Sequence, residues 1–398
     1  MKEINYINST KDMRAIAVGV VACLFLWMTS TVVSAENAMA NVPIKIGGFF
    51  STYANITDKK SPYLRYAKAT DQIDFGKETF LGLQIQAELA EKSNIYLQMV
   101  GDHYQDDFSV NLDWAYLKYN INDEVDFRMG KMGLPAFLYS DYTNVRYALT
   151  WARVPSEAYE MLPLGSFTGI DLLIRVPVGD YTLNIQPYFG NTSITSPFGF
   201  AGEVTTTIDD LIGIALSFDL DMQTFRLSYF EAVANMTDPA LLLNLNLIHG
   251  GTIPSVPISD IVNDLEMSFT SFGYLLNYGS FELIVEASER DTPVPVISAF
   301  QAVFISAAYQ VNDTYKPYIV LAKLDTRNVT SRPQEQFSIS LGVRMELSGT
   351  MALKAEWQTA DIDTDYTNNQ GLFALGGLVE GESLDSVNLI SVGLDAVF

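Results

Sequence analysis

Residues able to carry out catalysis or bind a transition metal are few in this chain. His103 and His249 are the only histidines, and no nucleophile-elbow sequence accompanies them to supply an activated serine. The single cysteine, Cys23, lies in an apolar run near the N-terminus, so a site built from histidine and cysteine ligands is weakly supported. The sequence therefore gives little support for hydrolytic or metal-dependent chemistry.

Carboxylates are abundant, and most are better explained as solvated loop charges. Asp and Glu number 47 against 24 Lys and Arg, which gives a net charge of −23 and argues against nucleic-acid binding. Close pairs such as Asp106-Asp107 and Asp209-Asp210 carry little information in so acidic a chain. The run Asp361, Asp363, Asp365 could hold calcium with loop carbonyls, but it lacks the glycine and terminal glutamate of a helical calcium loop. We expect no cofactor and assign no metal site.

The N-terminus predicts a secretory signal peptide. Lys2, Lys11 and Arg14 precede an apolar run, 15–28, that is too short to span a bilayer comfortably. A small-x-small cleavage site ends at Ala35, and an alternative one ends at Ala40. We predict a cleaved signal at 1–35 and a single domain over 36–398. The mature domain would then contain no cysteine and no disulfide.

From Val42 onward the dominant pattern is alternation of apolar and polar residues. In the segment 337–346, apolar residues occupy every odd position, with polar residues or glycine between them. This alternation places one face of a strand in an apolar medium and the other in a polar one. The runs are mostly ~10 residues or longer, the length of a tilted membrane strand, whereas soluble strands have a mode of ~5–6 residues.

The connections between these runs alternate between short and long. Tight turns such as 178–180 and 278–280 are separated by long connections, of which 132–168 is the longest. A soluble sandwich has no reason to segregate its connections in this way, so the pattern predicts an all-β, transmembrane antiparallel barrel. The sixteen expected strands are 42–54, 77–90, 94–104, 108–120, 125–131, 169–178, 180–190, 210–220, 222–234, 265–278, 280–290, 299–311, 315–325, 336–347, 350–360 and 386–398.

The C-terminal strand resembles a known assembly signal. Ser391, Gly393, Ala396 and the final Phe398 are similar to the pattern by which the barrel-assembly machinery recognises its clients. The exit from the fifth strand, Gly130-Lys131 followed by Pro135, resembles the trimeric sixteen-stranded porins of Gram-negative outer membranes. The resemblance implies a third loop folded into the lumen, a homotrimer embedded in outer-membrane lipid, and passive transport of small hydrophilic solutes and ions.

Strand parity and the long loop together suggest which charges line such a pore. A charge on the lipid face costs ~2–4 kcal/mol at mid-membrane, so charged strand residues are expected to face inward. We expect wall arginines opposite loop carboxylates, producing a transverse field at the constriction, although the same charges could simply pair within the lumen. The candidate constriction residues are Asp126, Arg128, Lys131, Asp141, Arg146, Arg153, Glu157, Glu160, Asp171 and Arg175.

The sequence thus favours a passive pore in the outer membrane over an enzyme. Its alternatives are a barrel that presents a surface for binding or adhesion, or an outer-membrane hydrolase. The position of 132–168 separates these hypotheses, since a loop inside the barrel narrows a pore and a loop outside it forms a binding surface. We expect weak ion selectivity, tilted toward cations at low salt by the acidic loops.

Overall fold

The computed structural model describes residues 42–64, 67–102, 108–197, 203–236, 263–292, 299–327, 334–363, 369–374 and 378–398. The predicted signal peptide, both histidines, Asp106-Asp107 and Asp365 lie outside these residues. The signal peptide and the domain boundary at 36 therefore stay predictions.

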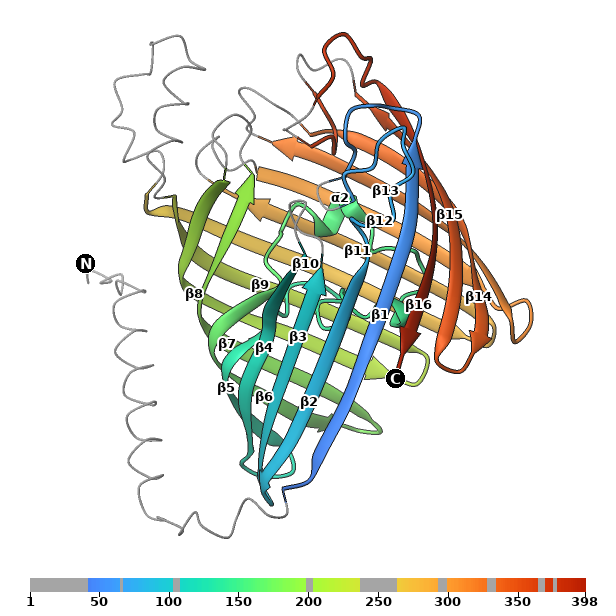
Figure 1. Cartoon of the computed structure of the whole chain (residues 1–398). Coiled ribbons are helices and arrows are strands. Elements are labelled where there is room, and N and C mark those ends of the chain that lie inside the picture. Colours follow the sequence, from blue (N-terminus) through green and yellow to red (C-terminus); the bar gives the residue numbers. More distant parts are fainter. Residues whose placement is uncertain are drawn as a thin grey trace. The chain divides into compact units, whose positions relative to one another are not determined.

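The described chain forms a closed barrel of sixteen antiparallel strands, as the alternation predicted (Figure 1). Each strand pairs with its neighbours in sequence, and β1 pairs with β16 to close the barrel. The strands are β1 (Ile44–Thr57), β2 (Phe80–Ala90), β3 (Ser93–Asp102), β4 (Ser109–Asn120), β5 (Val125–Gly133), β6 (Ser166–Val178), β7 (Tyr181–Pro197), β8 (Glu203–Leu220), β9 (Gln223–Met236), β10 (Leu265–Tyr278), β11 (Phe281–Asp291), β12 (Ala299–Tyr309), β13 (Tyr315–Arg327), β14 (Gln336–Ser348), β15 (Met351–Ile362) and β16 (Ser386–Val397).

Two strands extend well beyond the predicted ends. β7 and β8 continue as a hairpin in which Thr192–Pro197 pairs with Glu203–Ile208, after register shifts in both strands. This extension carries no apolar–polar alternation, because it is rich in Thr and Ser on both faces. Threonine nevertheless favours extended backbone, so the hairpin continues where the membrane pattern has stopped.

The tight turns lie together at one end of the barrel and the long connections at the other. Gly179 and Gly279, in the turns after β6 and β10, have φ of +64° and +60°. Glycine adopts this left-handed conformation without a steric penalty, which explains its place in these short turns. The other connections include the first loop, L1 (residues 58–79), and the third, L3 (residues 134–165).

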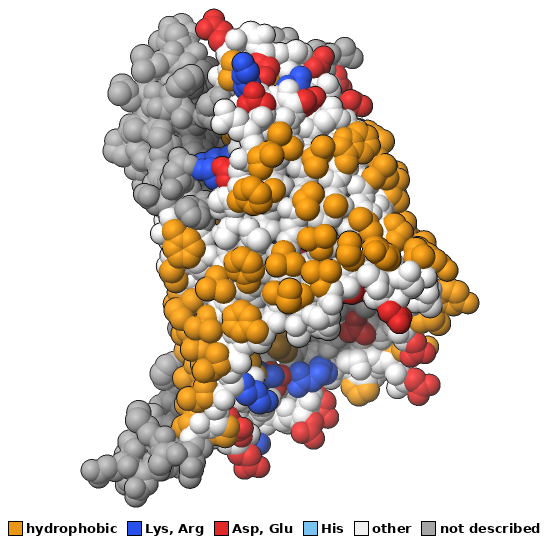
Figure 2. Space-filling view, turned by 45° about the vertical axis from the view of Figure 1, so that its right-hand side comes forward, with side chains coloured by type: hydrophobic (Ala, Val, Ile, Leu, Met, Phe, Trp, Pro, Cys, Tyr) orange, Lys and Arg blue, Asp and Glu red, His pale blue; other side chains and the backbone are white. Residues whose placement is uncertain are grey.

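The outer face of the barrel is apolar. Figure 2 shows hydrophobic side chains in a band over the strands, with Lys, Arg, Asp and Glu gathered above and below it. Exposed members of the band include Ile212, Ile305 and Trp357, and exposed aromatic residues such as Tyr278 and Tyr309 flank the tight turns. An apolar band bordered by aromatic residues matches the hydrocarbon core and interface of a bilayer, and barrel closure satisfies every strand's backbone there. In the part of the chain that the structure describes, no helix has the length and hydropathy needed to cross a membrane.

The interior is not uniformly polar. Phe230, Phe269, Phe300 and Phe304 face the inside of β9, β10 and β12 and are almost completely buried. An apolar inner wall would be exposed to water in an empty barrel. Here it is covered by L3, which makes the loop part of the barrel core.

Candidate functional site

L3 crosses the inside of the barrel, as the family resemblance implied. It contains a 3-10 turn, η4 (Arg146–Ala148), and one short helix, α2 (Ser156–Tyr159), which contacts β12 and β13 (Figure 1). At its base the Leu134 amide donates to the Gly165 carbonyl at 3.1 Å. The chain leaves β5 at Gly133, and Gly130, inside this last part of the strand, has a φ of +134° that glycine adopts without a steric penalty.

Aromatic packing fixes L3 against the apolar wall. Trp151 lies edge-on to Phe304 with ring centroids 5.6 Å apart, and its indole donates to Ser306 Oγ at 2.7 Å. Phe137 packs between Tyr159 at 4.3 Å and Phe269 at 5.1 Å. Each fully buried aromatic side chain contributes roughly 1.5–3 kcal/mol through loss of apolar surface from water, so these contacts hold the loop firmly.

A buried charge cluster, here called the latch, ties L3 to β1, L1 and β16. Arg153 Nη2 donates to Glu78 Oε2 at 2.6 Å, to Asn55 Oδ1 at 2.8 Å and to Ser391 Oγ at 2.8 Å. Arg146 pairs with the same carboxylate, Glu78. Burial alone would raise the pKa of Glu78, but the two guanidinium groups outweigh it and hold the pKa well below the ordinary value. The latch therefore stays charged at neutral and mildly acidic pH.

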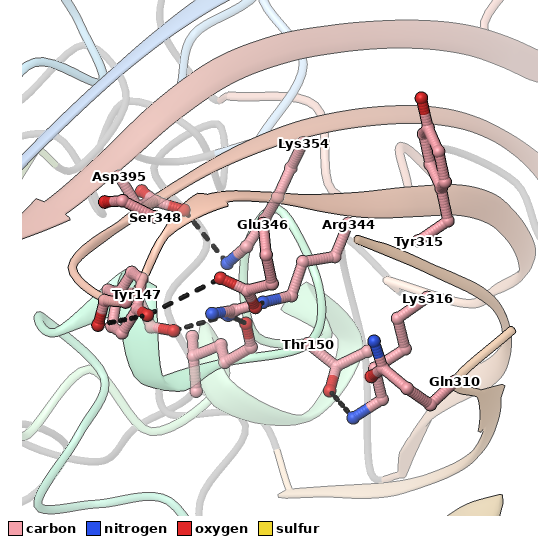
Figure 3. A network of polar contacts seen from close by, with 12 residues as sticks. Tyr147, Thr150, Gln310, Tyr315, Lys316, Arg344, Glu346, Ser348, Lys354 and Asp395 are labelled. Carbon is pink, nitrogen blue, oxygen red and sulfur yellow. Dashed lines mark hydrogen bonds and ion pairs between the residues drawn. The ribbon is translucent and has the colours of Figure 1, made fainter. Parts of the chain in front are cut away.

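A second network holds the middle of L3 to β11 and β13–β16 (Figure 3). The Lys354 Nζ pairs with Asp395 at 2.9 Å and donates to the Trp151 carbonyl at 2.8 Å. Arg344 Nη1 donates to the carbonyls of Tyr147 and Leu149. Thr150 donates to Glu282 at 2.7 Å, which also pairs with Lys316 at 2.9 Å.

A third set of contacts holds the first turn of L3 to β9–β11. Leu138 lies over Gly273, where a Cβ would come within 3.1 Å of the leucine side chain. The Leu138 amide donates to Glu286 at 2.6 Å, and the hydroxyl of Tyr159 donates to the same carboxylate at 2.8 Å. Because wall carboxylates and wall amines bind main-chain groups of the loop, its path does not depend on loop side chains alone.

On the opposite wall, arginines pair with carboxylates of neighbouring strands. Arg128 makes two hydrogen bonds to Asp171, with Nε to Oδ1 at 2.8 Å. Asp126 accepts from Arg175 Nη1 at 2.9 Å and pairs with Lys118 at 2.9 Å. These four predicted residues do face the lumen side by side, but each arginine is matched within the wall.

The predicted pairing of wall arginines with loop carboxylates is wrong for Arg146, Arg153, Glu157 and Glu160. Arg146 and Arg153 on L3 meet Glu78 of L1, and Arg153 also meets Glu356 on the wall, whereas we expected wall arginines to meet loop carboxylates. Glu157 is buried and accepts from Gln336 of β14, and Glu160 is also buried, so neither faces Arg128. Strand parity indicates which face a side chain occupies, but not which segment of a loop lies across from it.

The last two predicted residues, Asp141 and Lys131, lie in different places relative to the arginines of the wall. Asp141 is exposed on L3 and lines the same cavity as Arg175. Lys131 pairs in register with Thr168 on the strand face opposite to Met132, and its Nζ donates to the Leu112 carbonyl at 2.6 Å. The structure thus brings Asp141 to the arginine wall and leaves Lys131 apart from it. The role of these residues in conduction stays a prediction.

A cavity remains between L3 and strands β6–β10. Its volume is about 430 Å³. The polar residues in its lining are Asp141, Arg175, Asn184, Gln186, Ser217, Asp219, Thr224 and Arg226, with Tyr139 and Tyr142 on the loop side. This mixture of charges, amides and hydroxyls suits water and hydrophilic solutes.

The described residues contain no cluster of three or more His, Cys, Asp or Glu side chains arranged to hold a metal ion. Asp361 lies near the end of β15 and Asp363 follows this strand, while Asp365 lies outside the described residues. The calcium hypothesis for this run gains no support from that part of the chain.

Comparison with known proteins defines the class of fold. The sequence matches no protein-family model and no curated protein. Among solved structures, the anion-selective porin of Comamonas acidovorans superposes with a TM-score of 0.57 at 15% identity over 90% of this chain and 100% of the porin. The channel DcaP of Acinetobacter baumannii gives 0.57 at 10% identity over 92% and 100%. OmpT of Vibrio cholerae, an outer membrane protein in trimer form, gives 0.56 at 14% identity over 90% and 99%. The chain has the fold of the sixteen-stranded outer-membrane porins.

Proposed function

We propose that this protein is a diffusion porin, which passes small hydrophilic solutes and ions through the outer membrane without catalysis. The observation that carries the proposal is the position of L3. The loop fills the apolar half of the barrel and leaves a polar-lined space beside β6–β10. A barrel used only as a binding surface has no need to bury its longest loop inside the lumen.

The proposal includes the assembly state and the route to the membrane. The Vibrio cholerae OmpT structure is described in trimer form, and we extend that state to this chain as a homotrimer. We also propose that a signal peptide at 1–35 is removed and that the barrel-assembly machinery inserts the mature chain into outer-membrane lipid. Chemical cross-linking of the detergent-extracted protein tests the trimer, and N-terminal sequencing tests the cleavage site.

Planar-bilayer recording tests the pore. We expect the purified protein to give discrete open steps of conductance. We expect the ions that carry this current to pass through the cavity beside L3. The predicted mature chain lacks cysteine, so a single cysteine can be placed at Tyr142, an exposed residue of L3 in the cavity lining. Modification of Tyr142→Cys by a bulky, charged methanethiosulfonate should reduce the step size because the reagent narrows the path.

The matched control is Thr205→Cys, which lies in the exposed extension of β8. Its modification should leave the step size unchanged. A folded, heat-modifiable barrel that never conducts would overturn the pore and favour the surface-binding alternative. If the step size of Tyr142→Cys does not change on modification, the conducting path lies elsewhere in the barrel.

Ion selectivity should depend on the arginine wall. Neutralising Arg128 and Arg175 together removes the counter-charges of Asp171 and Asp126, so the lumen beside them becomes more negative. We expect the double variant Arg128→Gln, Arg175→Gln to strengthen cation preference, measured as a shift in reversal potential under a salt gradient. The effect should fade as salt rises, because screening shortens the reach of these charges. Identical reversal potentials in variant and parent would remove both arginines from the conducting path.

A further inference from the structure

Arg226, on β9, is a lumen-facing cation whose hydrogen-bonding capacity is only partly used. Its Nη1 donates to Ser217 Oγ at 3.2 Å and its Nη2 to the Pro135 carbonyl at 3.3 Å, both neutral acceptors. Its Nε is buried and has no hydrogen-bond partner in the part of the chain that the structure describes. Within the described residues it forms no ion pair, unlike Arg128, Arg175, Arg146 and Arg153.

The wall carboxylate two strands away, Glu286, is already engaged by the loop. Arg226 pairs in register with Gly273 of β10, which pairs with Glu286 of β11. Leu138 lies over Gly273, between the two charged side chains, and both oxygens of Glu286 accept hydrogen bonds from L3. L3 therefore separates Arg226 from Glu286 and leaves the guanidinium facing the cavity.

Two hydroxyl groups near Arg226 also lack a hydrogen-bond partner within the described ranges. Ser228 lies two residues along the same face of β9, and its buried Oγ is unpartnered. The buried hydroxyl of Tyr188, on β7, is likewise unpartnered, and its ring lies over Gly213 of β8. Neither hydroxyl lines the cavity, so Arg226 is the donor of this group that faces a solute there, and a carboxylate is the acceptor that suits a guanidinium best.

An anion with no cationic partner among the described residues lies beside Arg226 in the cavity lining. Asp219 of β8 is exposed and accepts only from Asn184 at 2.9 Å and from Thr224 at 3.0 Å among the described residues. Thr224 pairs with Asp219 in register, and Arg226 pairs with Ser217, so Asp219 and Arg226 are diagonal neighbours. Diagonal neighbours lie ~7–8 Å apart at their Cα atoms.

We propose that the cavity beside L3 binds small α-amino acids as zwitterions, with the carboxylate on Arg226 and the ammonium group facing Asp219. An α-amino acid carries its two charged groups on one α-carbon, so it can present a carboxylate to a cation and an ammonium group to an anion on adjacent strands at once. Asp141, on the loop side of the cavity, adds a second negative charge for the ammonium group. This inference rests on the proposed pore, since it names the solute class that the same cavity favours.

Binding can be measured without conduction, by calorimetry on the detergent-purified barrel at pH 7. The probes are L-alanine, its carboxylate-only analogue propionate and its ammonium-only analogue ethylamine. We expect alanine to bind more tightly than either analogue. Arg226→Gln should weaken alanine and propionate about tenfold, the worth of a charge-assisted hydrogen bond, while Asp219→Asn should weaken alanine and leave propionate unchanged.

The control variant is Arg327→Gln, which removes the same charge from an exposed pair with Glu289 outside the cavity. It should bind all three probes like the parent. Asp219 is exposed, so Asp219→Asn keeps the test valid even if Arg226→Gln fails to fold. Equal affinities for alanine and propionate, or an Asp219→Asn variant that still prefers alanine, would overturn the zwitterion site. If the barrel binds alanine but never conducts, the proposed pore is wrong and the amino-acid site stands. If the barrel conducts but does not bind alanine, the amino-acid site is wrong and the pore stands.

Discussion

Replacing Arg153 with methionine is expected to release L3 from β1, L1 and β16 and to give larger, noisier channel openings. Arg153 is the donor that joins Glu78, Asn55 and Ser391, and its Nη1 lies 3.6 Å from Glu356. Removing one partner of a buried ion pair costs ~3–5 kcal/mol where the remaining charge is left without compensation. Arg146 still pairs with Glu78 in this variant, so we expect a loss at or below the lower end of that range. Single-channel recording gives the conductance change, and the temperature of the heat-modified gel shift gives the loss of stability.

The matched control is Arg327→Met, since Arg327 and Glu289 form an exposed ion pair. Such pairs contribute ~0–1 kcal/mol, so this variant should behave like the parent. Because the pKa of Glu78 is lowered in the folded barrel, its contribution is fully present above the ordinary carboxylate pKa of ~4.3 and is lost only as pH falls through the folded value. The difference between Arg153→Met and the parent should therefore be constant from neutral to mildly acidic pH. Unchanged conductance and an unchanged shift temperature would show that the latch does not hold L3.

The strand pattern was predictable because the membrane imposes it. Each outward position within the membrane must be apolar, and β14 obeys this rule, with Leu341 exposed outside. The outward face of β13 is apolar as far as Leu321 and becomes charged from Lys323 onward, toward the end of the strand. The rule weakens where L3 covers the inner wall, since Phe269 inside and Phe272 outside β10 are both apolar. The role of Glu286 was not predictable for the same reason. Ile284, two residues earlier on the same inward face, is apolar and buried, so the pattern does not mark this face as polar.

The charge pairing of the site was not predictable from parity. Parity places Arg128 and Asp171 on the lumen side, but the partner of Arg153 is Glu78, which lies in L1 and has no strand pattern to mark it. Parity would have excluded Lys131, which shares a strand face with Phe127 and Met129. It was included through the family resemblance of the β5 exit, and that resemblance concerns the path of the chain more than the direction of this side chain.

Deleting Phe398 is expected to remove most of the assembled protein from the outer membrane while barely affecting a barrel that has already closed. In the closed barrel the Phe398 amide donates to the Gly48 carbonyl at 3.0 Å, and the Gly48 amide donates to the Phe398 carbonyl at 2.9 Å. The phenyl ring lies over Gly48, where a Cβ would come within 2.5 Å of it, and Phe398 is 68% exposed. Its loss costs the finished barrel two hydrogen bonds, each worth about 1 kcal/mol, among the many that join sixteen strands.

An effect on assembly that exceeds this small loss must arise before closure, when an exposed C-terminal aromatic is available to the assembly machinery. Quantifying the protein in outer-membrane fractions measures assembly, and the heat-shift temperature of the truncated chain refolded in detergent measures the stability of the closed barrel. Phe398→Tyr is the control, because it keeps the aromatic ring over Gly48 and should reach the membrane at the parent's level. If the truncated chain accumulates normally, Phe398 is only the last residue of the seam between β1 and β16. If the refolded truncated barrel loses enough stability to explain its low level in the membrane, the defect lies in the seam itself. The terminal pattern is then not a recognition signal.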